Sequence, residues 1–172
     1  MKVTPINLAN SYKNIALKKT MSNSISFKGK EESKLTPYQV KKEFEKIGVE
    51  AQILLDGSIE LSSYTPDKWM IKSLKEDENE LFKHVTSIRG YANFENSKLT
   101  STHALESVGK SVYFGFSNIE EIPNLKYVGK DAYFNCSKIK NVGYMRIGRD
   151  AHFEESKVLD SSKVSYGRYK HI

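Results

Sequence analysis

Apolar and polar positions in the second half of the chain recur with a fixed spacing. Four segments that align with one another begin at Ile88, Val108, Val128 and Ile147, and a fragment of a fifth begins at Tyr166. Successive segments are therefore 20, 20, 19 and 19 residues apart. A period near 20 residues is typical of a solenoid, in which coils stack because none of them can bury its apolar face alone. The pattern predicts four stacked coils and part of a fifth.

Each repeat contains a short alternation in which an Ala or Val and then a Phe are separated by one residue. This period of two is typical of a half-buried strand, and stacked coils would place such strands side by side in a parallel sheet. Two columns of side chains should then face the core. They comprise Ala92, Val112, Ala132 and Ala151 in the first column and Phe94, Phe114, Phe134 and Phe153 in the second.

A serine follows each of these phenylalanines by three positions, where the chain must turn inward. The four residues are Ser97, Ser117, Ser137 and Ser156. Buried backbone groups in such a turn need a short polar partner. We therefore expect the four hydroxyls to form a structural ladder that links adjacent coils.

The pattern of residues 35–84 differs and predicts a helix, a hairpin and a second helix. Thr36-Pro37 is typical of a helix start, and Gly48 is typical of the residue after a helix end. Asp56-Gly57 lies between two apolar runs, as in a tight β-hairpin. The second helix should then open at Thr65-Pro66-Asp67.

We expect this α-β-β-α region to cap the first coil, because the end of a solenoid otherwise exposes its apolar face. The stripe Val40-Phe44-Ile47 on the first helix and Trp69 on the second are suitable covers. A separate recognition module is the alternative. The acidic run Glu76-Asp77-Glu78 is expected to be a solvated helix end or loop, because it lacks the ligand spacing and the glycine of a calcium loop.

Two strings within the repeats resemble known repeat families. Residues 119–128, Ile-Glu-Glu-Ile-Pro-Asn-Leu-Lys-Tyr-Val, resemble a leucine-rich repeat of the short bacterial kind. Residues 128–142 are similar to repeats of bacterial surface proteins of the BspA type. Together the resemblances cover residues 82–172, about half of the chain. They imply an α/β repeat fold, a leucine-rich-repeat-like parallel β-solenoid with an N-terminal cap, that serves as a binding scaffold.

Composition separates a basic segment from the rest of the chain. Residues 1–34 contain 7 lysines and 2 glutamates and show no apolar periodicity, which is typical of a disordered tail. The tail could be a delivery signal, a contact with an anionic surface, or a solvated leader without a partner. It lacks the apolar core of a secretory signal peptide, so a cytoplasmic protein, or export without a cleaved signal, is expected. We expect no membrane span.

The sequence offers little that would support catalysis. The single Cys136 excludes an internal disulfide. His84, His103, His152 and His171 lie far apart along the chain without metal-ligand spacing. We find no nucleophile, phosphate-binding or dinucleotide motif. We therefore expect a protein that is not an enzyme and that uses no metal or cofactor.

The residues that alternate with the inward columns should form an exposed face. We expect it to bind a protein partner, because tyrosine gives a large contact area with a polar tip and because the outward residues vary while the inward ones repeat. Packing between neighbouring strands is the alternative use of such aromatic residues. The candidate residues are Tyr91, Asn93, Glu95, Tyr113, Asp131, Tyr133, Asn135, Asp150, His152 and Glu154.

Two other partners are conceivable from the sequence. The net charge of +6 suggests nucleic acid or an anionic surface, bound through the tail and through convex-side lysines such as Lys126, Lys138 and Lys140. The acidic residues of the exposed face argue against nucleic acid. The second is another copy of the chain. Residues 166–172 should form a last strand with Ile172 over Phe153, and the unpaired backbone groups at the outer edge of this strand could pair with that copy.

Overall fold

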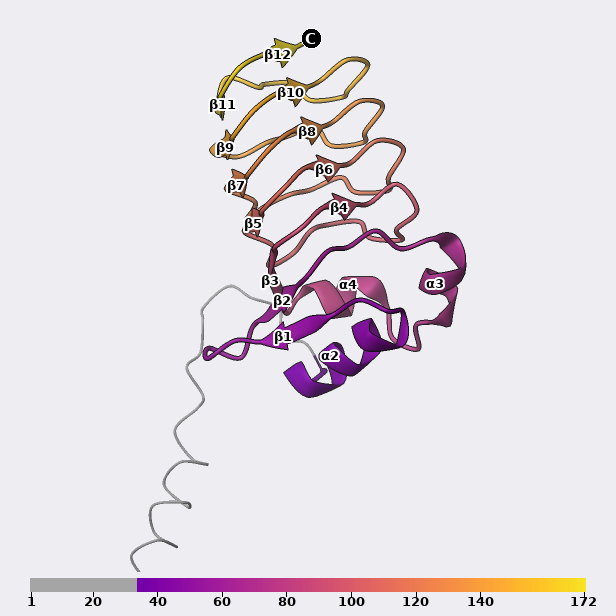
Figure 1. Ribbon diagram of the computed structural model, residues 1–172. Helices are drawn as coiled ribbons and strands as arrows, with labels where there is room; N and C mark the ends of the chain where they lie inside the picture. Colours follow the sequence, from indigo (N-terminus) through magenta and orange to yellow (C-terminus); the bar gives the residue numbers. More distant parts are fainter. Residues whose placement is uncertain (1–33) are drawn as a thin grey trace, which may run out of the picture. The chain divides into compact units, whose positions relative to one another are not determined.

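The computed structural model describes residues 34–172, so the prediction of a disordered basic tail lies outside the described residues except for Lys34. Within this range three helices and two strands precede a series of ten short strands (Figure 1). The helices are α2 Pro37–Lys46, α3 Lys68–Ser73 and α4 Glu78–Phe82. The strands are β1 Ala51–Ile53, β2 Ile59–Leu61, β3 Val85–Ile88, β4 Ala92–Asn93, β5 Ser107–Val108, β6 Val112–Tyr113, β7 Tyr127–Val128, β8 Ala132–Tyr133, β9 Met145–Ile147, β10 Ala151–His152, β11 Val164–Tyr166 and β12 Lys170–His171.

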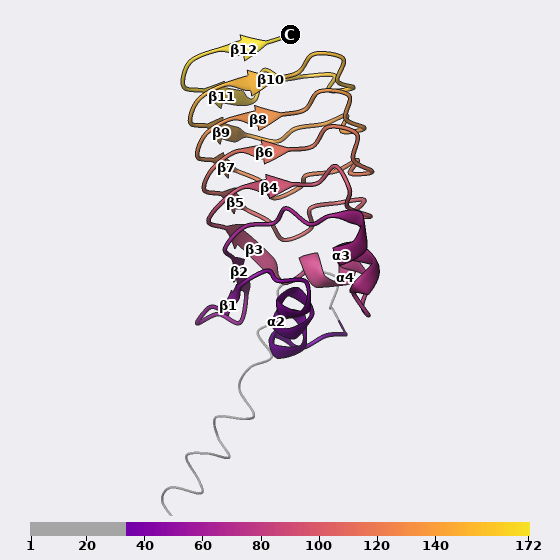
Figure 2. The same ribbon diagram turned by 45° about the vertical axis from the view of Figure 1, so that its right-hand side comes forward.

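The coils form a parallel β-solenoid with two sheets. A seven-stranded sheet has the order β1-β2-β3-β5-β7-β9-β11, and a five-stranded sheet has the order β12-β10-β8-β6-β4. Every coil therefore supplies one strand to each sheet, and Figure 2 shows the coils stacked from the helices to β12. The remaining side of the coils is joined by isolated parallel bridges that link Ser101, Glu121, Asn141 and Asp160 in succession.

The second sheet is a difference from the sequence prediction, which placed one strand in each coil. A leucine-rich repeat likewise has one strand, followed by a helix or a 3₁₀ turn. Here Val108 is the last residue of another strand, and the equivalent residues Ile88, Val128, Ile147 and Tyr166 end the corresponding strands of the other coils. The buried positions beside and within these strands, such as Leu105 and Val108, lie three residues apart in most coils, so they do not display a period of two.

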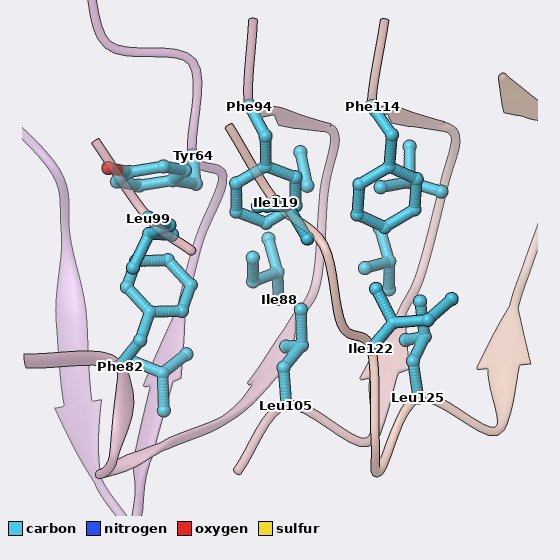
Figure 3. Close-up of a cluster of buried hydrophobic side chains, with 14 of the residues drawn as sticks. Tyr64, Phe82, Ile88, Phe94, Leu99, Leu105, Phe114, Ile119, Ile122 and Leu125 are labelled. Atoms are coloured by element: carbon cyan, nitrogen blue, oxygen red, sulfur yellow. The ribbon is translucent and has the colours of Figure 1, made fainter. Parts of the chain in front are cut away.

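The inward columns were predicted correctly. Phe94, Phe114 and Phe134 are fully buried, and Phe153 is 6 % exposed. The ring centroids of consecutive phenylalanines lie 5.4, 5.3 and 4.8 Å apart, and the rings are nearly parallel. Figure 3 shows the first two of these rings side by side above a layer of Leu and Ile side chains. The stack forms a continuous apolar core along the solenoid.

The predicted serine ladder is wrong. Ser97, Ser117 and Ser137 are buried and Ser156 is half-buried, but within the described chain no hydrogen bond from their hydroxyls reaches a neighbouring coil. The backbone N–H of each serine donates to the carbonyl of the phenylalanine three residues earlier. The turn therefore satisfies the backbone N–H of each serine without its hydroxyl, and the hydroxyls of Ser97 and Ser137 are buried without a hydrogen-bond partner.

The N-terminal region covers the first coil, in part as predicted. Thr36 caps α2 through a capping box with Gln39, and Val40 and Phe44 are fully buried. Strands β1 and β2 form the expected antiparallel hairpin, and β2 continues the seven-stranded sheet by pairing in parallel with β3. The polypeptide thus uses both an extra strand and a helix to close this end.

Two details of the predicted cap are wrong. Trp69 is 77 % exposed, and the aromatic ring that covers the first coil is Tyr64, which is fully buried beside Phe82 and Phe94 (Figure 3). Glu78 was expected in solvent but is only 3 % exposed at the start of α4. Its carboxylate accepts hydrogen bonds from the Tyr64 hydroxyl and from the backbone N–H of Lys98 at 2.7 Å.

The last strand also differs from expectation. Strand β12 pairs in parallel with β10, which places Lys170 beside Ala151 and His171 beside His152. Ile172 is 89 % exposed and does not cover Phe153. The Lys170 ammonium lies 5.8 Å from the centre of the Phe153 ring instead, because the side chain of Lys170 points inward at this position.

Candidate interaction face

The outer face of the five-stranded sheet carries a central column of in-register side chains. Asn93, Tyr113, Tyr133, His152 and His171 occupy equivalent positions in β4, β6, β8, β10 and β12. The ring centroids from Tyr113 onward are 4.7, 4.4 and 4.3 Å apart, and the interplanar angles are at most 10°. These four residues are here called the aromatic stack.

Each ring of the aromatic stack packs face to face against the ring of the next coil, so the ring faces are covered. The first four residues of the column are half-buried, and His171 is exposed. Burial, together with the nearby Asp131 carboxylate, raises the pKa of the Tyr133 hydroxyl. The surface therefore presents hydroxyl groups and ring edges. Such a surface suits hydrogen bonding to a partner better than stacking on a flat ligand.

The column on one side of the aromatic stack contains Ser111, Asp131 and Asp150, and their side chains accept hydrogen bonds from the backbone of the next coil. The Asp131 carboxylate accepts a hydrogen bond from the backbone N–H of Asp150 at 3.2 Å, and the Asp150 carboxylate accepts one from Tyr169 at 3.2 Å. In the preceding coil Ser111 accepts from the backbone N–H of Asp131 at 3.4 Å. Asp131 and Asp150, which the sequence suggested as binding residues, therefore also hold adjacent coils together.

Arginines of the following coils neutralise these two aspartates. Arg149 lies 3.6 Å from Asp131, and Arg168 lies 2.9 Å from Asp150. Although partial burial opposes ionisation of Asp150, the Tyr169 N–H and the Arg168 guanidinium lower the pKa of its carboxyl group. Both arginines belong to a row that also contains Lys110 and Lys130, here called the basic corner row, at the junction between the two sheets.

The other flanking column contains Glu95, Gly115, Asn135 and Glu154. The Asn135 amide donates to the Glu154 carboxylate at 2.6 Å, and Nδ1 of His152 lies 3.7 Å from the other oxygen of Glu154. Burial raises the pKa of the Glu154 carboxyl group. Hydrogen bonds from its own backbone N–H and from Asn135, together with the nearby His152 and His171, have the larger opposite effect, so the net pKa is lowered. Glu95 is exposed, and its backbone N–H donates to Asn93 at 2.9 Å.

The structure also unites residues that the sequence left apart. His152 and His171 lie one coil apart and stack on each other, with Glu154 beside them. The sequence showed no metal-ligand spacing because that spacing is known for local motifs, whereas here it equals the length of a coil. A search for histidines at the coil period would have found the pair.

The three lysines suggested as an anionic-surface contact do not form one patch. Lys126 precedes β7 and lies 3.5 Å from Glu106, while Lys138 follows β8 and donates to Asn118 at 2.8 Å. Lys140 lies further along the same side as Lys138. They therefore belong to different sides of the coil.

The fold and this face define a β-solenoid repeat protein with coils of about 20 residues. No protein-family model, curated protein or solved structure matches the chain significantly. None of the helices in residues 34–172 has the length and apolar character needed to cross a membrane.

Proposed function

We propose that this protein is a non-catalytic scaffold that binds a protein partner through the outer face of the five-stranded sheet. The observation that carries the proposal is the contrast between the two faces of this sheet. The inward positions repeat Ala or Val and Phe in each coil, whereas the outward positions differ from coil to coil. A fixed core with a varied surface is how repeat proteins present binding residues on a rigid frame.

The chemistry of the face indicates what kind of partner would fit. It combines tyrosine and asparagine edges with the carboxylates of Glu95 and Glu154, and the aspartate charges are already paired with arginine. A protein segment that offers backbone amides and basic side chains would complement this surface. The likeness to short bacterial leucine-rich and BspA-type repeats supports a binding role, because both resemblances imply a scaffold.

Nucleic acid is a competing ligand because the basic corner row runs beside the face. Lys130, Arg149 and Arg168 recur at the coil spacing of about 4.8 Å. However, Arg149 and Arg168 are paired with Asp131 and Asp150, which reduces the charge available to a phosphate backbone. Titration with a mixed-sequence duplex at increasing salt distinguishes the two ligands. Tight binding that weakens steeply with salt would contradict the protein-binding proposal.

The proposal can be tested by capture of partners on the immobilised full chain. The face variant combines Tyr91→Ser and Glu95→Lys, two exposed positions outside the aromatic stack and the core. The control variant combines Tyr127→Ser and Arg146→Glu, which are exposed on the other sheet. We expect proteins captured by the wild type and the control to be lost from the face variant.

Equal capture by all three chains, or equal loss from both variants, would contradict the assignment of this face. Self-association is tested in the same samples by sizing chromatography. If the wild-type chain is dimeric and the face variant is monomeric, then the partner is a second copy of the chain.

A further inference from the structure

His152, Glu154 and His171 form the one group of metal-ligating side chains found within residues 34–172. One ligand atom from each residue can be chosen so that all three lie within 4.8 Å of one another. His152 and Glu154 are half-buried, and His171 is exposed. The group lies at one end of the five-stranded sheet, where β10 and β12 bring the two histidines into register.

The spacing of these atoms is close to that of a zinc site. Ligands of a tetrahedral zinc ion are about 3.4 Å apart when the bonds to nitrogen and oxygen are about 2.1 Å long. Nδ1 of His152 and the near oxygen of Glu154 are already 3.7 Å apart. The two imidazoles are stacked at 4.3 Å, so one ring must turn for its nitrogen to point at a shared ion. His171 can do so because it is exposed.

A neighbouring residue holds the carboxylate in place. Asn135 donates to the oxygen of Glu154 that is not the one near His152. This arrangement leaves one carboxylate oxygen for an ion and fixes the orientation of the group, as hydrogen-bonded partners do around metal ligands.

We propose that His152, Glu154 and His171 bind a divalent transition metal ion, with Zn²⁺ as the representative ion. Two imidazoles and a carboxylate are a ligand set that suits Zn²⁺, and hard cations such as Mg²⁺ prefer oxygen ligands. Three protein ligands leave a fourth position for water or for a side chain of a bound partner. The site shares His152 and Glu154 with the proposed interaction face, but binding of the ion requires only these three residues and can be measured without a protein partner.

The site is tested by calorimetric titration of the full chain with ZnCl₂ at neutral pH, with MgCl₂ as the negative control. The ligand variants are His152→Tyr, His171→Tyr and Glu154→Gln. Tyrosine is the residue that Tyr113 and Tyr133 supply at the equivalent position, so it preserves the aromatic stack while removing the nitrogen ligand. His103→Asn is the matched control, because it removes a histidine at a left-handed position that asparagine tolerates.

We expect the wild type and His103→Asn to bind one Zn²⁺ per chain. Loss of a residue that only supports a metal ligand weakens metal binding by about 10–100-fold. Each ligand variant should therefore weaken Zn²⁺ binding by at least this much. In NMR spectra of the wild type, Zn²⁺ should shift the ring signals of His152 and His171 and leave those of His84 and His103 in place. This measurement keeps the test decisive if a variant does not fold.

Three outcomes would overturn the proposal. The first is an absence of Zn²⁺ binding by the wild type at millimolar concentration. The second is unchanged affinity in any of the three ligand variants, since all three residues are required as ligands. The third is an equal response to Mg²⁺, which would indicate nonspecific attraction to carboxylates.

Discussion

At the scale of single residues, the glycine in each coil is required by the close approach of neighbouring backbones. A Cβ atom built on Gly109, Gly129, Gly148 or Gly167 would collide with a backbone carbonyl oxygen of the preceding coil. None of these four glycines has a positive φ. The sequence repeats these glycines, but a repeat alone cannot show which atoms lie on the neighbouring coil.

Replacing Gly129 should therefore damage the stack, whereas replacing another glycine should not. In Gly129→Ala the new Cβ meets the carbonyl of Gly109, which cannot move without separating two coils. We expect a loss of about 3 kcal/mol or more in the free energy of unfolding, at the upper end of overpacking effects. Gly143→Ala is the control, because nothing lies within 4 Å of the added atom. Its effect should stay within about 0.5 kcal/mol. Urea denaturation of both variants measures the difference, and equal stabilities would contradict this account of the glycines.

The sequence predicted the inward residues of the coil better than the polar ones. Phe134 and its equivalents repeat without change, so periodicity alone places them in the core. Ser137 repeats as faithfully, but its hydroxyl has no hydrogen-bond partner, whereas the side chains of Asp131 and Asp150 accept hydrogen bonds from the backbone of the next coil. Their roles could not be read from the sequence, because an aspartate that accepts a neighbouring backbone N–H looks the same as one in solvent.

At the scale of elements, the cap shows how the helices attach to the solenoid. Strand β2 extends the seven-stranded sheet, and the N-terminus of α4 is fixed to the first coil by Glu78. The sequence predicted α2 and the hairpin from local signals. It missed α4, which is only five residues long and is held by contacts with Tyr64 and Lys98, both distant in the sequence.

Removing the hydroxyl of Tyr64 should weaken this attachment in a pH-dependent way. Burial raises the pKa of the Glu78 carboxyl, although hydrogen bonds from Tyr64 and Lys98 oppose the shift. Tyr64→Phe leaves the carboxylate with one donor fewer, so we expect a loss of about 1–3 kcal/mol in the free energy of unfolding near neutral pH. Tyr127→Phe, at an exposed position on the other sheet, is the control.

The raised pKa sets the direction of the pH effect. The folded protein binds the Glu78 proton more tightly than the unfolded chain, so protonation of Glu78 favours folding. This contribution is complete below the ordinary glutamate pKa of about 4.3 and is lost as pH rises through the higher folded value. The Tyr64→Phe loss should therefore be smaller in acid than at neutral pH. Urea denaturation at both pH values checks this, and a loss that does not change with pH would show that Glu78 is not the group affected.

At the scale of the whole molecule, the coils are structurally equivalent units. Val108 pairs with Val128, and Val112 pairs with Ala132, so a position in one coil lies beside the same position in the next. The sequence period predicted this stacking, and it also predicted the number of coils. It could not predict the division of each coil into two sheets, because the additional strands are defined by pairing between coils rather than by their own composition.

Equivalence of the coils predicts that one of them can be removed. Deletion of residues 109–128 joins Val108 to Gly129 and leaves the following coil in the register that the deleted one had. The ion pair between Arg149 and Asp131 and the hydrogen bond from Asp150 to Asp131 remain within the shortened chain. We expect a folded protein whose stability is lower by the loss of one interface between coils, as in other repeat proteins. The denaturant m-value should also fall, because less surface is exposed on unfolding.

The matched control is deletion of residues 109–118, half a coil. This change places Ile119, which follows the inward turn, directly after Val108, so inward and outward positions no longer align with those of the neighbouring coils. We expect this chain to lose its cooperative unfolding transition. Circular dichroism and urea denaturation compare the two deletions. If the deletion of a complete coil is as disruptive as the deletion of half, then the coils are not interchangeable, and the stability of the solenoid depends on particular contacts within the coil from residue 109 to 128.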